Sequence, residues 1–170
     1  MVMSLVIDEA YLPATLTAPL MTDREFVEFC SQYPDYSIEM SAEGDILIMP
    51  PVGGESSFRN SELSAQLGTW ARKDGRGRAF DSSVEYFLPS GAAYSPDASW
   101  VLRSRLDKLT REEKRKFPRL CPDFVVELRS PSDRLAKLKA KMREWIENGA
   151  QLGWLLDPDS SHGIYLSPRP

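Results

Sequence analysis

The pattern of apolar and polar positions is clearest in the second half of the chain. Residues 124–128 (FVVEL) have the β-branched and aromatic side chains of a buried strand, with a proline on either side. Apolar residues then recur at helical spacing over 132–148, and 151–157 (QLGWLLD) is again strand-like. We predict a strand, a helix capped by Ser132 or Asp133, and a second strand. A right-handed crossover of this kind makes the two strands parallel.

Two further helices are predicted upstream. The pattern TDRE at 22–25 is a capping box, which opens a short helix that ends by Pro34. Residues 55–73 form a longer helix, closed by Asp74 and Gly75. Its large apolar side chains are expected on or near one face: Phe58, Leu63, Leu67 and Trp70.

Strands occupy the intervals between these helices. Residues 36–40 and 46–49 flank the turn Glu-Gly-Asp, which predicts a β-hairpin. The runs 79–88 and 95–102 are strand-like and are separated by a Pro-Ser-Gly turn, so we expect them to be antiparallel neighbours. Residues 103–119 are predicted to be a basic loop with a turn or two of helix.

Length and composition favour a single globular domain. The chain has 170 residues, of which 42% are hydrophobic and 27% are charged. We expect an irregular arm over 1–20 and one domain over 21–170. No apolar run is long enough for a membrane span, and the N-terminus lacks the basic segment of a signal peptide, which favours a cytoplasmic protein. With one histidine and two distant cysteines, Cys30 and Cys121, buried thiols are expected rather than a zinc site.

Charge is distributed unevenly along the chain. The net charge is −4, but residues 103–143 hold 14 of the 21 Lys and Arg and only 6 of the 25 Asp and Glu. That segment therefore carries +8 and the remainder −12. The asymmetry points to a surface for a polyanion such as a nucleic acid, although a solvated helical face would give the same pattern.

Glu127 is the anomaly in the central strand. Side chains alternate along a strand, so Glu127 shares one face with Val125 and Arg129. A carboxylate in a buried strand must be paired, protonated or bound to a cation, because burying it alone costs several kcal/mol or more. The simplest interpretation is a structural ion pair with Arg129.

A second strand-borne carboxylate, Asp97, suggests a chemical use for Glu127. Asp97 lies thirty residues upstream in the sequence SPDASWV. An Asp and a Glu on adjacent strands, with a strand carbonyl beside them, form an all-oxygen site suited to Mg²⁺. Such an ion polarises a scissile phosphate and lowers the pKa of a bound water.

These residues resemble a known signature. Pro96-Asp97 followed by Glu127-Leu128-Arg129 is similar to the PD-(D/E)XK nuclease motif. More narrowly, SPDASWV, CPDFVVELRSPSD, KMREWIENGA and WLLDP, together with the hairpin end IMPPVGGES, closely resemble the bacterial putative restriction endonuclease family, often described only as a domain of unknown function. The resemblance covers about residues 22–165. It implies an α/β (α+β) restriction-endonuclease-like core, a mixed β-sheet flanked by helices, preceded by an N-terminal helix and hairpin.

The chain departs from the superfamily motif at position 129, where Arg stands in place of Lys. Arg stays protonated and cannot act as a general base, although its guanidinium can hold a phosphate. The resemblance implies that a lysine on the following helix takes this role. Lys141 in KMREW matches, with Lys137 as the alternative; from the residues alone, Lys141 is a solvent-facing helix residue. By its match to the family's loop, Glu55 is the expected additional acid, with Glu39 as second choice.

The leading hypothesis is a metal-dependent endonuclease acting on DNA. Asp97 and Glu127 would bind Mg²⁺ or Mn²⁺, and Lys141 would orient water or contact the phosphate, with Arg129 and Glu55 assisting. The resemblance also suggests a homodimer. The alternative is a catalytically impaired nucleic-acid-binding or regulatory module on the same scaffold, which the arginine at 129 motivates. A third possibility is a protein-interaction domain in which the carboxylates form ordinary ion pairs.

Overall fold

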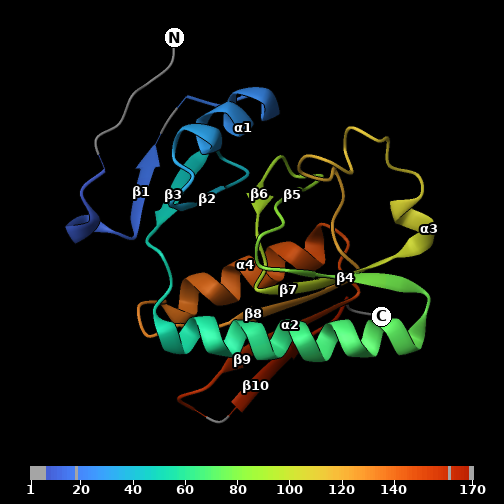
Figure 1. Ribbon diagram of the computed structural model, residues 1–170. Helices are drawn as coiled ribbons and strands as arrows, with labels where there is room; N and C mark the ends of the chain where they lie inside the picture. Colours follow the sequence, from blue (N-terminus) through green and yellow to red (C-terminus); the bar gives the residue numbers. More distant parts are fainter. Residues whose placement is uncertain (1–6, 18, 161, 169–170) are drawn as a thin grey trace.

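The computed structural model describes residues 7–17, 19–160 and 162–168, which form two five-stranded sheets and their covering helices (Figure 1). The N-terminal sheet has the strand order β1 (Ala14–Thr17), β3 (Asp45–Met49), β2 (Ser37–Met40), β6 (Ala93–Tyr94), β5 (Tyr86–Phe87). The C-terminal sheet has the order β10 (His162–Leu166), β9 (Leu152–Asp157), β8 (Phe124–Leu128), β7 (Ala98–Leu102), β4 (Gly77–Asp81). The helices are η1 (Glu9–Tyr11, a 3-10 turn), α1 (Asp23–Gln32), α2 (Gly54–Asp74), α3 (Arg103–Leu106) and α4 (Leu135–Glu147).

Helices α1 and α2 begin and end where local signals place them. Thr22 caps α1, and the reciprocal bond runs from the Thr22 amide to Glu25 Oε2 at 2.8 Å, which completes the predicted capping box. Helix α2 ends at Gly75, whose φ of 73° is the left-handed conformation that glycine adopts readily. On α2, Leu67 and Ala71 are buried while Phe58 and Trp70 are exposed, so the apolar face is narrower than predicted.

The N-terminal sheet contains the predicted hairpin of β2 and β3, with Ile38 opposite Ile48. Helix α1 packs on it through Phe26 and Phe29, which are buried with these isoleucines in one apolar cluster. Residues 14–17, predicted to belong to an irregular arm, instead form β1 and pair with β3. Residues 1–6 of the predicted arm lie outside the described residues.

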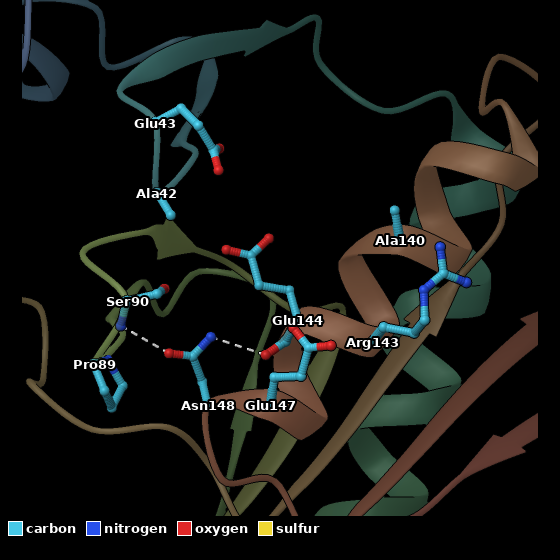
Figure 2. A pocket seen from close by; sticks show the side chains of 9 residues that line it. All are labelled: Ala42, Glu43, Pro89, Ser90, Ala140, Arg143, Glu144, Glu147 and Asn148. Atoms are coloured by element: carbon cyan, nitrogen blue, oxygen red, sulfur yellow. Dashed lines mark hydrogen bonds between the residues drawn. The ribbon is translucent and has the colours of Figure 1, made fainter.

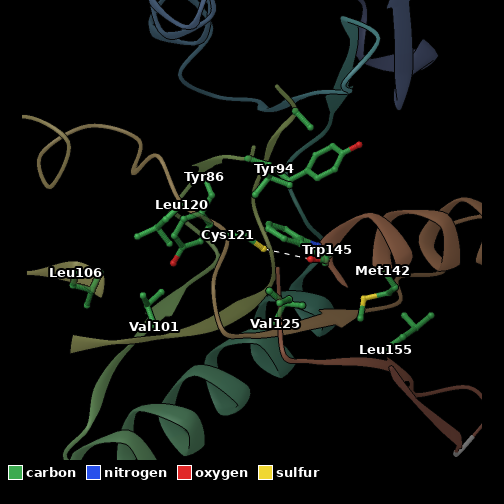
Figure 3. Close-up of a cluster of buried hydrophobic side chains, with 13 residues drawn as sticks. Tyr86, Tyr94, Val101, Leu106, Leu120, Cys121, Val125, Met142, Trp145 and Leu155 are labelled. Carbon is green, nitrogen blue, oxygen red and sulfur yellow. Dashed lines mark hydrogen bonds between the residues drawn. The ribbon is translucent and has the colours of Figure 1, made fainter. Parts of the chain in front are cut away.

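The C-terminal sheet is mixed, as predicted. Strands β8 and β9 are parallel and are connected by α4, whereas the other pairs are antiparallel. Helix α2 covers one face, where Leu67 packs with Val126, and α4 covers the other, where Met142 packs with Val125. The largest apolar cluster fills the α4 side (Figure 3), and there the Cys121 thiol donates to the Trp145 carbonyl at 3.4 Å. Cys121 is buried as expected, whereas Cys30 is half-buried; both are free thiols.

Of the two runs predicted as single strands, 79–88 divides into two strands and 95–102 contains one strand that is shorter than predicted. In the first, Asp81 Oδ1 accepts from the Ser83 amide at 3.0 Å, and this turn ends β4 so that the chain can enter β5 in the other sheet. In the second, only the part after Asp97 belongs to β7. Strands β4 and β7 pair antiparallel, as predicted for the two runs, and β5 pairs antiparallel with β6, which lies before the second run.

Helix α4 begins three residues later than predicted and lacks a side-chain cap. Asp133 Oδ2 accepts from the Ser130 amide at 2.7 Å, and the Ser132 hydroxyl bonds to that of Ser130 at 3.0 Å. Both candidate caps are therefore engaged in the turn that precedes the helix. The strand β10 was not predicted. None of the helices in the described part of the chain is long and apolar enough to cross a membrane.

Candidate active site

The candidate site lies where the chain passes from the N-terminal to the C-terminal sheet. Residues 95–97 form this passage, between the end of β6 and the start of β7. Strand β7 pairs with β8 so that Ala98 lies opposite Val126, and extending this register by one residue places Asp97 beside Glu127. The two predicted carboxylates thus meet at one end of the mixed sheet.

Lys141 reaches this end of the sheet from α4. Its Nζ lies 3.0 Å from Glu127 Oε1 and 2.7 Å from Glu39 Oε1. It also donates to the Ser95 carbonyl at 3.3 Å. The Lys141 side chain is only 15% exposed, so it is not the solvent-facing residue that the sequence alone would suggest. Lys137, the alternative, is exposed.

Glu127 is not paired with Arg129, so the simplest interpretation of its burial is wrong. Besides Lys141, Glu127 accepts a hydrogen bond from the Trp145 indole at 2.8 Å. Arg129 turns to Asp157, whose Oδ2 lies 2.8 Å from Arg129 Nη1. The guanidinium Nε of Arg129 is buried and has no hydrogen-bond partner.

Asp97 is held by two N–H donors from different elements. The Leu128 amide donates to Oδ2 at 2.6 Å, and Asn60 Nδ2 donates to Oδ1 at 2.9 Å. One donor belongs to the central strand β8 and the other to α2. The plane of the carboxylate is therefore fixed, while each oxygen retains a second lone pair for another ligand.

Of the two candidates for an additional acid, Glu39 lies beside Lys141 and Glu55 does not. Glu55 is 74% exposed at the start of α2 and pairs with Arg59. Glu39 is buried in β2, where its Oε1 accepts from both Lys141 and the Ser95 amide. Its position between buried Ile38 and Met40 was the available signal, because a polar residue inside a short apolar strand needs a buried partner.

Lys141 is a cation in this environment. Burial lowers the pKa of its ammonium, but the carboxylates of Glu127 and Glu39 more than offset burial, so the pKa lies above its usual value. A protonated amine can donate three hydrogen bonds and accept none. Lys141 is thus suited to hold an anionic oxygen or orient a water, and not to remove a proton.

Two of the carboxylates clustered near Lys141, Glu127 and Asp97, have a pKa above the usual value. Burial raises the pKa of Glu127, against the opposing effect of Lys141, and the charge on Asp97 raises it further. Burial likewise raises the pKa of Asp97, which the Leu128 amide partly offsets. Glu39, Asp97 and Glu127 when ionised outnumber the single ammonium of Lys141. In that state the cluster would have an unbalanced negative charge in a poorly hydrated place.

Comparison with known families identifies the chain. The model of the Uma2 family, described as "Putative restriction endonuclease", matches residues 23–162. The chain belongs to the Uma2 family. The predicted family is thereby confirmed.

A solved structure has the same fold. It is a crystal structure described as a putative nuclease belonging to DUF820 from Anabaena variabilis ATCC 29413. The two chains are 24% identical and superpose with a TM-score of 0.65, over 79% of this Uma2 chain and 73% of the other. This similarity and the mixed sheet between helices confirm the predicted fold class. No curated protein matches the chain.

The donors of this Uma2 site suit a hard divalent cation. Within the described residues there is no group of three or more His, Cys, Asp or Glu side chains arranged to hold a metal ion. Mg²⁺, however, is typically bound by only one or two carboxylates, with waters and a substrate phosphate as the other ligands. Asp97 and Glu127 supply such a pair, and a divalent ion would offset the excess negative charge.

Sequence reasoning missed one buried carboxyl near the cluster, Glu85. It lies just before β5, is 6% exposed, and its Oε1 has no hydrogen-bond partner. Burial raises its pKa to about 9, and the negative charge of Glu39 contributes. Glu85 is accordingly neutral at pH 7. A single carboxyl within the apolar run VEYF was the signal that could have found it.

A pocket of about 590 Å³ opens between α4 and the turns at 42–43 and 89–90, and its lining is acidic (Figure 2). Glu43, Glu144 and Glu147 line it with a single cation, Arg143. None of the carboxylates of the cluster lines this pocket. An acidic lining repels phosphate groups, so the pocket does not suit a nucleic-acid backbone.

Proposed function

We propose that this Uma2 protein is a metal-dependent endonuclease that hydrolyses phosphodiester bonds in DNA. Asp97 and Glu127 would hold Mg²⁺ or Mn²⁺, and Lys141 would be the cation beside them. The observation that supports this most strongly is the 3.0 Å contact between Lys141 Nζ and Glu127. It puts a lysine from the following helix at the end of the strand where the nuclease motif has its own lysine.

Each residue near the proposed cation would have a separate role in the reaction. When bound, a divalent ion would polarise the scissile phosphate and lower the pKa of the attacking water. Lys141 would donate hydrogen bonds to a non-bridging phosphate oxygen or to that water. Trp145 and the Leu128 amide keep the Glu127 and Asp97 carboxylates in place. Glu39 would be the additional acid in place of Glu55, because its Oε1 accepts a hydrogen bond from Lys141.

Arg129 would contact a phosphate rather than take part in proton transfer. Asp157 holds one end of its guanidinium, and the pKa of Asp157 is lowered despite partial burial because Arg129 donates to it. The Arg129 side chain is 28% exposed, so part of it can be reached from solvent. A guanidinium suits planar recognition of a phosphate group.

The basic segment 103–119 supports a polyanionic substrate. Arg103, Lys108, Arg111, Lys114 and Arg115 are exposed in this segment. Exposed Lys and Arg side chains bind the phosphates of a nucleic acid favourably, because binding releases the counterions condensed on it. Binding through this segment should weaken steeply as salt concentration rises.

Supercoiled plasmid DNA tests the proposal. A circular substrate reports only internal cuts, so nicked or linear product identifies an endonuclease. We expect purified protein to form these products with Mg²⁺ or Mn²⁺, and EDTA to prevent it. Salt-sensitive DNA binding without cleavage in either metal would contradict the proposal.

That outcome would favour the second candidate, a nucleic-acid-binding or regulatory module without hydrolysis. The observation behind it is that residue 129 is an arginine engaged by Asp157. If neither metal nor DNA binds, the carboxylates form ordinary ion pairs and a protein-interaction domain is the account that remains.

A further inference from the structure

Asn60, a polar residue of α2, has only one end of its side-chain amide hydrogen-bonded. Its Nδ2 donates to Asp97 Oδ1 at 2.9 Å. Its own Oδ1 is buried and has no hydrogen-bond partner. The orientation of the amide follows from the first contact, because the opposite orientation would place Oδ1 against the Asp97 carboxylate.

An unpaired buried oxygen of this kind requires an explanation. Leaving a buried acceptor unsatisfied costs about 1–3 kcal/mol, and native structures rarely tolerate it without an ion, a water or a functional role. Helix α2 packs on the sheet through Leu63, Leu67 and Ala71, all further along the helix, so packing does not require an asparagine at position 60.

The chemistry of this oxygen matches what the site lacks. The predicted cation site has two carboxylates, Asp97 and Glu127, and no third acidic, histidine or cysteine ligand in the described chain. Side-chain amide oxygens are ligands or water-binding partners of hard divalent cations. Asn60 Oδ1 lies on the same amide that touches Asp97, so it is adjacent to one of these carboxylates.

We propose that Asn60 is a residue of the cation site, in which Nδ2 orients Asp97 and Oδ1 supplies a further oxygen to the cation or to its water. The inference rests on the proposed metal-dependent function and extends it to a residue of α2. It assigns Asn60 two roles that a purely structural hydrogen bond would not have.

Mn²⁺ binding, followed by electron paramagnetic resonance of the free ion, tests this without reference to activity. We expect Asn60→Ala to raise the dissociation constant for Mn²⁺ by about 10-fold or more, the usual effect of removing a residue that orients a ligand. Ser64→Ala is the matched control, because Ser64 is also half-buried on α2, one turn later. It should bind Mn²⁺ as the wild type does.

Mn²⁺ should raise the urea concentration at which the protein is half unfolded. The size of this increase distinguishes a role of Asn60 in the cation site from a purely structural role. A merely structural Asn60 would lower the midpoint in Asn60→Ala but leave its increase with Mn²⁺ unchanged, because the increase depends only on metal affinity. We expect the increase to shrink. An Mn²⁺ affinity within twofold of the wild type in Asn60→Ala would overturn the inference.

Asn60→Asp decides the question if Asn60→Ala does not fold. It keeps the size and an oxygen at this position but adds a charge beside Asp97. Without metal the urea midpoint of Asn60→Asp should be lower than that of the wild type. Mn²⁺ should then raise this midpoint by at least as much as it raises that of the wild type, and loss of that response would overturn the inference.

If the wild type itself binds no Mn²⁺, the proposed metal-dependent function fails, whereas normal binding in both wild type and Asn60→Ala refutes only the role of Asn60.

Discussion

Lys141 is surrounded by groups from several elements, which explains both its burial and its charge. Glu39 comes from β2, Glu127 from β8, and the Tyr94 ring lies 5.3 Å from its Nζ. An ammonium over the face of an aromatic ring gains further stabilisation when it is poorly hydrated. Each of these contacts depends on the positive charge.

Replacing Lys141 with methionine should therefore be strongly destabilising. The change leaves two buried carboxylates without their cation, and breaking a buried pair in this way costs about 3–5 kcal/mol. Urea unfolding at pH 7 measures the loss. Lys116→Met is the control, because Lys116 and Glu112 form an exposed pair and its removal should not change stability measurably. Equal effects of the two changes would contradict this description of Lys141.

Glu85 should make stability depend on pH. Burial raises its pKa to about 9 from 4.5, so the folded state binds the proton more tightly. The stability that this group contributes is fully present below pH 4.5 and is lost as pH rises through 9.

Glu85→Gln should remove this dependence. At pH 8 the variant should be more stable than the wild type, on the order of 2–4 kcal/mol, and the two should converge near pH 5. Urea unfolding across pH 5–9 tests this, with the exposed Glu28→Gln as control. A parallel pH profile for Glu85→Gln and the wild type would refute a raised pKa.

Some residues of the candidate site were nominated from the sequence, and others were missed. Asp97 and Glu127 were nominated from their places on strands, where alternation restricts the direction of a side chain, and Lys141 from the family resemblance; the structure brings the three together. Glu55 was preferred over Glu39 on the family loop alone. Asn60 and Glu85 were missed, since their importance depends on contacts between elements distant in the sequence.

Among the elements, β4 shows how closely the chain packs in the C-terminal sheet. Gly77 pairs with Leu102, and a Cβ at Gly77 would overlap the Trp100 ring and the Val101 carbonyl. Gly153 in β9 faces Met142 instead, whose terminal methyl would lie 2.5 Å from such a Cβ. Both positions exclude a side chain, but only the second has a flexible neighbour.

Gly77→Ala should accordingly cost more than Gly153→Ala. Overpacking typically costs about 1–3 kcal/mol, and we expect Gly77→Ala at the upper end because neither a backbone carbonyl nor a packed indole can move aside. Met142 can rotate, so Gly153→Ala should be milder. Urea midpoints compare the two, and a larger loss for Gly153→Ala would be inconsistent with this packing.

Most elements were predictable because their signals are local. The capping box at Thr22, the left-handed Gly75 and the parallel crossover of β8, α4 and β9 all follow from short sequence patterns. The division of 79–88 between two sheets was not predictable, because it depends on which strands the chain pairs with at a distance. Strand β1 was missed for the same reason.

In the whole molecule, the candidate site is also the place where the two sheets are joined. Glu39 belongs to the N-terminal sheet and Glu127 to the C-terminal sheet, and Lys141 bonds to both. The chain itself crosses between the sheets at 95–97, and Asp97 is the last residue of this crossing. The homodimer expected from the family resemblance stays a prediction, which light scattering can test.

The central claim is that Asp97 and Glu127 hold the cation that cleaves DNA. Asp97→Asn and Glu127→Gln test it most directly, because Gln keeps an acceptor for the Trp145 indole and Asn keeps one for the Leu128 amide. With Mg²⁺ and plasmid DNA, we predict that each variant loses at least about 100-fold in cleavage rate while its circular dichroism spectrum is unchanged. Cleavage at the wild-type rate in both folded variants would contradict the claim.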